Sequence, residues 1–433
     1  MTRKPSARPH EHHALALLKL IYRHGRLCRT DLASITGYSN FLVSRVCERL
    51  LTAGSISEVG TGDSTGGRRP TLLSVTPGLG RIIGLHVGTV NARVVVTDIA
   101  GNVLTFLKAP SLVQSGPDDA LPHLLALIDK ALGQAGVRSG ELLGIGVGIS
   151  GILDRASGVT LSWPKVPTWK NVPVRAAITS AWPTLVTIED TPRTMALAER
   201  CLGRARDASE FLYLMIGAGV GSALFFGGRP YTGSSGFAGE FGHMALRPDG
   251  PVCDCGGRGC LESYISASAL VRKAREAVSN GLHSELWHLS NGDPQAISVE
   301  LIAQAADAGD RFSLRLVEET GTCLGEAVVC LVNLLNPELV VIGGGVAAAL
   351  GKRILPTVDR IAREHALVEM TNGLRIELSQ LQEADWAIGA SLLVAEGALE
   401  NAFYSGARPV PTAAPGRRPR SAHRAGRKLV RST

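Results

Sequence analysis

The chain has 433 residues, more than one hydrophobic core usually serves, so we expect two or three compact units. Hydrophobic residues make up 45% of it, enough for sizeable cores, and no run of about 20 uncharged apolar residues is present, which excludes a transmembrane helix. The net charge of +7 is unevenly spread, because residues 1–80 carry eleven Lys and Arg against five Asp and Glu, whereas residues 404–433 carry eight and no acid. A basic head on an acidic body predicts a nucleic-acid contact at one end.

The first part of the chain has the pattern of a helical DNA-binding head. Residues 1–10 are basic, contain two prolines and are expected to be disordered. From Glu11, apolar residues at three- and four-residue spacing predict a helix that ends before Gly25. Further helices are expected over 30–36 and, with Ser39 as its N-cap, over 39–51. Two helices joined by a short turn containing glycine form a helix-turn-helix.

A basic hairpin follows these helices. Residues 56–59 and 71–75 have the character of strands, and residues 60–70 form a loop rich in glycine. This hairpin is a wing whose tip carries Arg68 and Arg69, suited to phosphates or to the minor groove. The alternative for a lone helix-turn-helix pattern is a small helical bundle, and the wing argues against it.

We therefore predict a winged helix-turn-helix domain over residues 11–77 that binds double-stranded DNA. The candidate DNA-binding residues of its third helix, several of which lie on the first turns where side chains usually reach base edges, are Ser39, Asn40, Ser44, Arg45 and Arg49.

After Arg81 the pattern changes to buried strands alternating with helices. A helix is expected over 118–133. The expected strands are 82–89, 94–98, 103–107, 142–149, 185–189, 212–216, 221–226 and 339–342. Composition and periodicity alone predict an α/β class with helices on the faces of twisted sheets.

A cysteine-rich stretch lies between Gly239 and Glu262. Three cysteines and one histidine supply the number and type of ligands that a structural zinc site needs: His243, Cys253, Cys255 and Cys260. Free cysteines in a polar loop are costly to keep unless something ligates them, and without a secretory segment a disulfide is not expected. Glu240 and Glu262 are not needed as metal ligands, so we expect them to accept hydrogen bonds from a ligand's hydroxyls.

The motifs of this region resemble those of the ROK family, which groups sugar-responsive repressors with sugar kinases. The resemblance rests on 216–222, 239–243 and 253–262, extends over most of 82–400, and includes the wing tip at 64–70. It implies a two-lobed actin-like ATPase fold over 82–400, with a zinc loop at 243–260. It also implies that a monosaccharide contacts the residues at the family's sugar positions, Asp190, Glu240, His243 and Glu262.

Two acidic motifs of the family's kinases are altered. His86 stands where the kinases have an aspartate that helps to organise Mg²⁺, and an imidazole cannot replace that carboxylate. Alignment of the run at 189–193 places Thr191 at the position of the catalytic base, although a one-residue slip would give that role to Asp190. We therefore expect no kinase activity. A nucleotide-binding remnant is expected at Gly88, Thr89, Gly217, Gly219, Gly343 and Gly344.

These patterns predict a sugar-responsive transcriptional regulator, a repressor, that is cytoplasmic, nucleoid-associated and without membrane contact. We expect a homodimer or homotetramer, Zn²⁺ as cofactor, a pseudo-palindromic operator and a monosaccharide or sugar phosphate as effector. The alternatives are a sugar kinase with a DNA-binding head, and a ligand-blind DNA-binding protein, hinted at by Lys165, Thr191 and Arg193. The basic tail over 404–433 is expected to be disordered.

Overall fold

The N-terminal head contains three helices and a small antiparallel sheet. The computed structural model describes residues 9–62, 69–138 and 140–405. The head's elements are α1 (Pro9–His24), β1 (Leu27–Cys28), α2 (Arg29–Thr36), α3 (Asn40–Thr52), β2 (Ile56–Thr61) and β3 (Thr71–Val75), with sheet order β1-β3-β2. The predicted helix-turn-helix and wing strands are present, and α1 begins two residues inside the segment expected to be disordered. Residues 1–8, Arg68 and the rest of 63–68 lie outside the described residues.

Local signals explain where α2 and α3 end and begin. Gly37 has a φ of 70°, a left-handed conformation that closes α2 and that glycine adopts without steric cost. The Ser39 hydroxyl accepts a hydrogen bond from the Leu42 amide and so caps α3 as expected. The buried face of α3 includes Val43, Val46 and Leu50, which leaves its other face for a partner.

The first lobe is built on a five-stranded mixed sheet of order β11-β7-β4-β5-β6. Its strands are β4 (Arg81–Val87), β5 (Asn91–Asp98), β6 (Val103–Pro110), β7 (Leu142–Ile149) and β11 (Leu185–Asp190). Helices α4 (Pro117–Gln134) and α5 (Val174–Ala181) cover one face. A small sheet of β8 (Ile152–Asp154), β9 (Val159–Ser162) and β10 (Lys170–Val172), which the sequence pattern did not predict, stands beside them.

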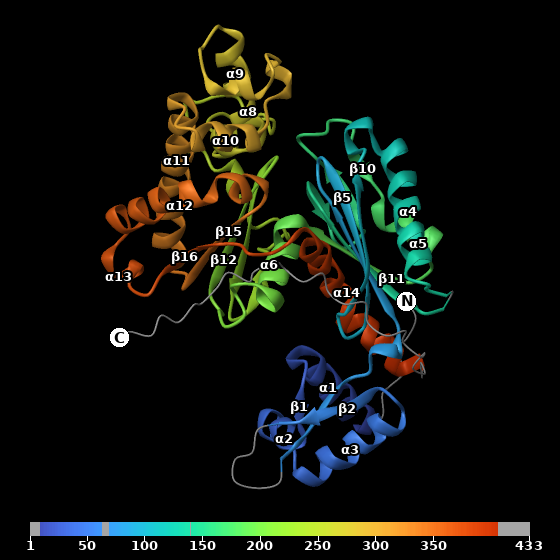
Figure 1. Cartoon of the computed structure of the whole chain (residues 1–433). Helices are drawn as coiled ribbons and strands as arrows, with labels where there is room; N and C mark the ends of the chain where they lie inside the picture. The colour runs from blue at the N-terminus through green and yellow to red at the C-terminus, as the bar shows by residue number, and fades with distance from the viewer. Residues whose placement is uncertain (1–8, 63–68, 139, 406–433) are drawn as a thin grey trace, which may run out of the picture.

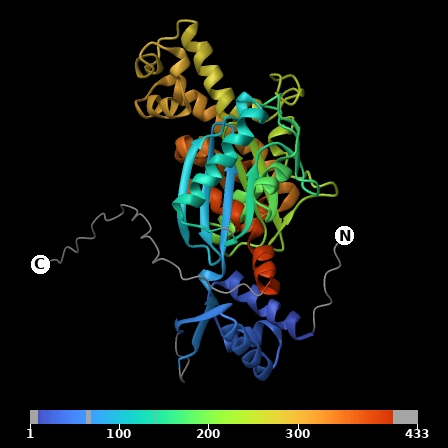
Figure 2. The same cartoon turned by 90° about the vertical axis from the view of Figure 1, so that its right-hand side faces the viewer.

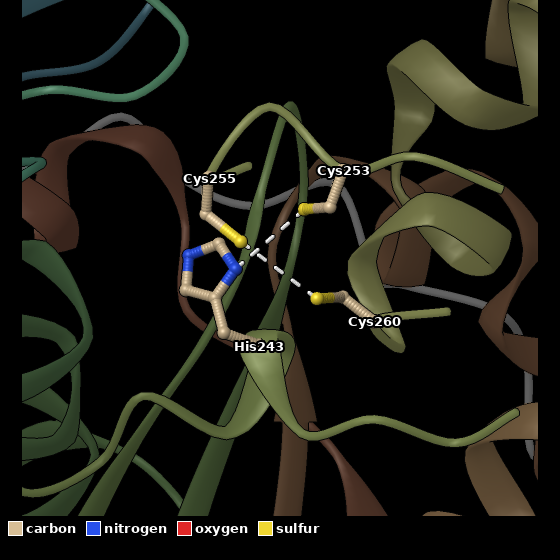
Figure 3. Close-up of side chains that lie close together, drawn as sticks. All are labelled: His243, Cys253, Cys255 and Cys260. Carbon is tan, nitrogen blue, oxygen red and sulfur yellow. Dashed lines mark hydrogen bonds between the residues drawn. The ribbon is translucent and has the colours of Figure 1, made fainter. Parts of the chain in front are cut away.

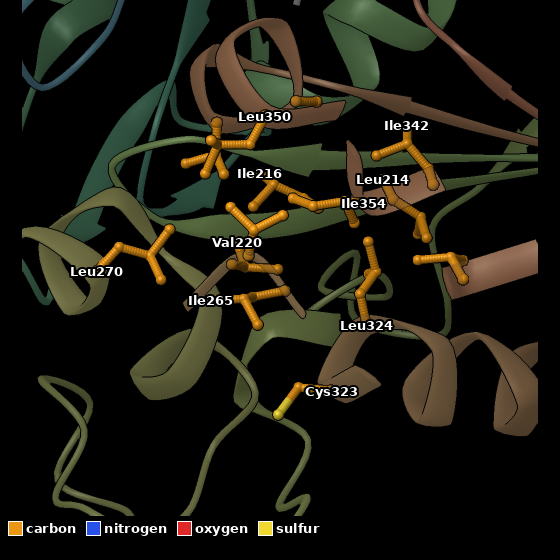
Figure 4. Packing of buried hydrophobic residues seen from close by; sticks show 14 of the residues in the cluster. Leu214, Ile216, Val220, Ile265, Leu270, Cys323, Leu324, Ile342, Leu350 and Ile354 are labelled. Atoms are coloured by element: carbon orange, nitrogen blue, oxygen red, sulfur yellow. The ribbon is translucent and has the colours of Figure 1, made fainter. Parts of the chain in front are cut away.

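The second lobe repeats this plan with a sheet of order β14-β13-β12-β15-β16. Its strands are β12 (Phe211–Ile216), β13 (Val220–Phe226), β14 (Arg229–Tyr231), β15 (Leu339–Gly343) and β16 (Arg375–Leu378). Its helices are α7 (Glu262–Ile265), α8 (Ala267–Ser279), α9 (Glu285–Leu289), α10 (Val299–Asp307), α11 (Arg311–Leu335), α12 (Gly345–His365) and α13 (Val368–Thr371). Side chains from β12, β13, β15 and the helices form one buried core, in which Ile216, Leu324 and Ile342 lie together (Figure 4).

Helix α14 (Glu383–Ser405) connects the lobes with the head, as both views show (Figures 1 and 2). It packs directly on the first lobe's sheet, since a Cβ placed on Gly84 would lie 1.9 Å from the Ala387 carbonyl oxygen. It also packs against α6 (Thr191–Leu202).

The C-terminal half of α14 belongs to the core of the head. Val394, Ala398 and Leu399 share that core with the residues of α1 and α3. The exposed side of the contact holds two ion pairs, Lys19 Nζ to Glu400 Oε2 at 2.7 Å and Arg23 Nε to Glu396 Oε1 at 2.6 Å. The tail predicted over 404–433 falls outside the described residues from 406 onward, and Ser405 is still helical. None of the helices in the described part of the chain is long and apolar enough to cross a membrane.

Candidate functional site

Four side chains of the second lobe converge on a point where a metal ion fits (Figure 3). The ligand atoms of His243, Cys253, Cys255 and Cys260 all lie within 4.8 Å of one another. The Cys255 and Cys260 sulfurs are 3.8 Å apart, and the Cys253 sulfur is 3.7 Å from His243 Nδ1. A tetrahedron with zinc–sulfur bonds of about 2.3 Å has edges of about 3.8 Å. The cluster can bind a metal, and its dimensions fit zinc.

The backbone around this cluster explains how three cysteines reach one point. His243 ends the short helix Phe241–His243, and the chain returns through bridges between Ala245 and Cys260 and between Val252 and Arg258. Gly259 has a φ of 66° and passes so close to Arg247 that a Cβ there would overlap the Arg247 carbonyl. Only glycine suits this position.

The four residues predicted to bind a sugar line one cleft between the two lobes. Asp190 comes from the end of β11, whereas Glu240, His243 and Glu262 come from the second lobe. His243 therefore borders both the metal cluster and the cleft, with Nδ1 on the metal side. A metal bound here would fix the imidazole next to the ligand.

Glu262 is held in place by contacts on both oxygens. Its side chain is buried, Oε2 accepts a hydrogen bond from the Val220 amide at 2.7 Å, and Oε1 pairs with Lys165 Nζ at 3.1 Å. Lys165 comes from the first lobe and also contacts Asp254 Oδ2 at 2.9 Å. Burial by itself lowers the pKa of Lys165, but the carboxylates of Glu262 and Asp254 outweigh that effect and raise the pKa above its ordinary value. Lys165 is therefore a stable cation that bridges the lobes.

Glu240 differs from Glu262 in its surroundings. Its side chain opens to the solvent of the cleft, and it has no ion-pair partner among the residues that the structure describes. Desolvation by the neighbouring protein raises the pKa of Glu240, an effect that His243 opposes and Glu262 reinforces. This carboxylate is free to accept hydrogen bonds from a ligand.

The structure places the side chains of residues 189–193 differently from what the alignment with the kinase motif predicted. Asp190, not Thr191, lines the cleft, whereas Thr191 is buried and its hydroxyl lies 3.3 Å from Ser150 Oγ. The one-residue slip left open by the alignment is therefore the arrangement found, with Asp190 in the cleft, so Thr191 gives no argument against catalysis. Alignment of a short motif could not decide between neighbouring residues at the end of a strand.

Two arginines hold Asp190. Arg193 Nη1 lies 2.6 Å from Asp190 Oδ2, and the Arg193 amide donates to Asp190 Oδ1 at 2.9 Å. Arg155, which the sequence pattern did not single out, pairs with Glu189 at 2.5 Å and lies 3.6 Å from Asp190 Oδ2. Burial and the neighbouring Glu189 carboxylate raise the pKa of Asp190 well above its ordinary value, and Arg155 opposes this. Both oxygens of this carboxylate are occupied by protein donors.

His86, which was expected to replace the kinases' metal-organising aspartate, is buried. His86 on β4 is 3% exposed, its ring lies 5.5 Å from that of Trp386 on α14, and burial lowers its pKa to about 3, so it is neutral. Arg93 lies over the same indole at 4.4 Å. Of the residues expected to form a nucleotide-binding remnant, Thr89 and Gly219 line the cleft. The other members, Gly88, Gly217, Gly343 and Gly344, are not part of its lining.

The head presents α3 outward. Asn40, Arg45 and Arg49 are exposed, Ser44 is half-buried, and the Ser39 hydroxyl is occupied as the helix cap. Arg69 is exposed at the edge of the wing. Phe41 was not singled out by the sequence pattern, yet it is 76% exposed on the first turn of α3. An exposed aromatic ring there is suited to apolar contact with a thymine methyl group.

Comparisons with known proteins cover both the head and the lobes. The family model described as ROK family matches residues 82–397. The xylose repressor of Caldicellulosiruptor bescii is 30% identical over 391 residues, which cover 90% of this chain and 97% of that protein. The glucokinase of Thermotoga maritima is 29% identical over 317 residues, 73% of this chain and 98% of that enzyme.

A solved structure is similar to this chain over most of its length. The crystal structure of a ROK family transcriptional regulator, a homologue of the E. coli MLC protein, matches with a TM-score of 0.75 at 25% identity and covers 92% of this chain and 98% of that one. The family model spans most of the two lobes, and the relatives with heads match over nearly their whole length. The chain belongs to the ROK family.

Proposed function

We propose that this protein is a sugar-responsive DNA-binding transcriptional repressor. The observation that carries the proposal is α14, which joins a winged head with an exposed basic helix to a two-lobed body with a carboxylate-lined cleft. The similarity to a xylose repressor over nearly its whole length supports this function. In this proposal residues 11–77 bind the operator and residues 82–400 bind the sugar.

Each part of the cleft has a role in this proposal. Glu240 and Glu262 accept hydrogen bonds from sugar hydroxyls, Asp190 contributes a third carboxylate, and the outward nitrogen of His243 contacts the sugar. Zn²⁺, held by His243 and the three cysteines, supplies a cross-link that fixes the loop from Glu240 to Glu262. A sugar that favours one arrangement of the lobes by about 1–3 kcal/mol changes operator occupancy five- to 150-fold.

The head also implies an assembly. One winged head covers too little DNA for specific affinity, so we propose a homodimer or homotetramer on a pseudo-palindromic operator. Arg45, Arg49 and Asn40 of each α3 would face the major groove, and Arg69 the backbone beside it.

A second function, a sugar kinase with a DNA-binding head, is favoured by the glucokinase similarity and by the position of Asp190 in the cleft. Two contacts argue against it. Asp190 is held by guanidinium groups on both sides, and His86 is buried against Trp386 where a Mg²⁺-organising carboxylate is needed. A neutral buried imidazole supplies neither charge nor ligand for a metal–nucleotide complex.

One experiment separates the two functions. Binding of the full-length protein to DNA from its own upstream region is measured with and without D-xylose, D-glucose and N-acetyl-D-glucosamine, and ADP formation is measured with the same sugars and ATP. We expect one sugar to change DNA affinity, Glu240→Ala to abolish that change, and the exposed control Glu369→Ala to retain it. Turnover at about 1–100 s⁻¹ that disappears in Asp190→Ala would establish the kinase instead.

A further inference from the structure

The last 28 residues of the sequence, 406–433, carry charge of one sign. They contain seven arginines and one lysine, and neither aspartate nor glutamate. This segment, called the arm here, begins one residue after the end of α14 and lies outside the described residues. Its eight cations have no acid among them to neutralise them, so the arm is suited to an anionic partner.

Helix α14 attaches the arm to the head and not to the lobes. Leu399 of α14 lies in the head's core together with Leu17 of α1, and Phe403 packs against the same core. On the outside of this contact, Lys19 Nζ pairs with Glu400 Oε2 at 2.7 Å, five residues before α14 ends. The arm therefore starts on the unit that we propose to bind DNA.

The arm is long enough to reach DNA on either side of the head. Residues of an extended chain span at most about 3.3 Å each, so the arm can span up to about 90 Å. A compact domain of the head's size is only about 30 Å across. A duplex held by the exposed Arg45, Arg49 and Arg69 would therefore lie within reach of the arm. Tethering would keep the arm's cations at a high effective concentration beside its phosphates.

Duplex DNA matches the arm's charge better than the protein's own surface does. Residues 81–403 carry a net charge of −7, because the whole chain has +7 while residues 1–80 have +6 and residues 404–433 have +8. That charge is spread over 323 residues. Duplex DNA, in contrast, carries one negative charge per about 1.7 Å of its axis, and cations that neutralise its phosphates release condensed counterions. DNA is therefore the stronger of these two partners for the arm.

The arm also repeats the sequence of the wing tip. Gly-Arg-Arg-Pro stands at residues 67–70 in the loop of the wing and again at residues 416–419 in the arm. Paired arginines beside glycine and proline are suited to phosphates and to the minor groove. The match to the family model ends at residue 397, so the second copy lies outside the region that this model covers.

We infer that the arm is a second DNA-binding segment, which contacts the phosphates of the duplex beside the site that the head binds. The inference rests on the proposed DNA-binding function and adds a contact that residues 11–77 do not include. Phosphate contacts carry no sequence information. The arm therefore raises the affinity for DNA of any sequence and leaves the choice of operator to the head.

The test measures how DNA affinity depends on salt for the full-length protein and two full-length variants. Fluorescence anisotropy follows binding to a duplex from the protein's own upstream region and to an unrelated duplex of equal length, both longer than the head, over a range of KCl concentrations. In the matched control the seven arginines of the arm become lysine, which keeps the charge. In the glutamine variant all eight cations are replaced: Arg408→Gln, Arg417→Gln, Arg418→Gln, Arg420→Gln, Arg424→Gln, Arg427→Gln, Lys428→Gln and Arg431→Gln.

We expect the glutamine variant to bind both duplexes at least about tenfold more weakly at low salt. Its log–log salt slope should be lower by at least about 2, because each lost phosphate contact removes about 0.9. The lysine control should keep the affinity and the slope of the unmutated protein. The preference for the upstream duplex should be the same in all three proteins. Their melting temperatures should also agree, because the substitutions lie beyond α14.

A glutamine variant with the affinity and slope of the unmutated protein would overturn the inference and leave the head's function intact. If that variant instead lost binding to phosphatidylserine vesicles while its DNA affinity stayed unchanged, the arm would be assigned to an anionic membrane surface and the inference would again fail. If the glutamine variant weakens as expected but none of the three proteins prefers the upstream duplex or responds to a sugar, the arm stands and the proposed repressor function fails.

Discussion

Substitution of Gly84 by alanine tests whether α14 is locked to the first lobe's sheet. The added Cβ would lie 1.9 Å from the Ala387 carbonyl oxygen and 2.9 Å from the Ser391 amide nitrogen, both of them backbone atoms of α14. A backbone carbonyl cannot rotate away, so the helix or the strand must move. Overpacking of a core usually costs about 1–3 kcal/mol, and we place this case at the upper end. At about 2–4 °C per kcal/mol, the melting temperature should fall by about 6–12 °C.

The matched control is Gly133→Ala. Gly133 lies in α4, no atom lies within 4 Å of the Cβ that alanine would add, and alanine is the better helix former by up to about 1 kcal/mol. Its melting temperature, measured by differential scanning fluorimetry, should be unchanged or slightly raised. Because the far end of α14 lies in the core of the head, Gly84→Ala should also weaken operator binding, whereas Gly133→Ala should not. A Gly84→Ala protein as stable as the control would refute the close packing of α14 on β4.

Three further predictions concern the metal, the wing and the contact between head and α14. Cys253→Ser or Cys260→Ser should release about one zinc per chain in metal analysis and abolish the sugar response before operator binding; no zinc in the unmutated protein would contradict the site. Arg69→Ala should lower the log–log salt slope of operator binding by about 0.9, and an unchanged slope would show that Arg69 touches no phosphate. The hydrogen bond from Arg23 lowers the pKa of Glu396 below its ordinary 4.5. This pair therefore stabilises the fold above that pH and ceases to do so as the pH falls through the lowered pKa. Arg23→Ala should accordingly lower the melting temperature at neutral pH but not at pH values well below 4.5, and an equal loss at both would contradict the assignment.

Much of the chain could be predicted from sequence because its signals are local. The periodicity of α3, the Ser39 cap and the glycine at 37 define the helix-turn-helix within a few turns of chain. The metal cluster is similarly local, since its four ligands lie between residues 243 and 260.

Helix α14 is an element that local sequence signals do not reveal. Five consecutive residues in its first half, 387–391, are buried, because the first lobe's sheet and α6 cover different sides of it. A helix buried all round has no amphipathic period to detect.

The charge of the ligand site was likewise decided only by tertiary structure. Lys165 and Glu262 are 97 residues apart in the sequence and belong to different lobes. Their side chains meet only because the two lobes face each other across the cleft. The pairing of Asp190 with Arg155, and the exposure of Asp190 in place of Thr191, depend on how the end of β11 turns into α6. By itself the sequence determined which residue types are present and where its local motifs lie. Only the packed structure decided which charges neutralise one another, because electrostatic interaction depends on distance in space and on burial, not on separation along the chain.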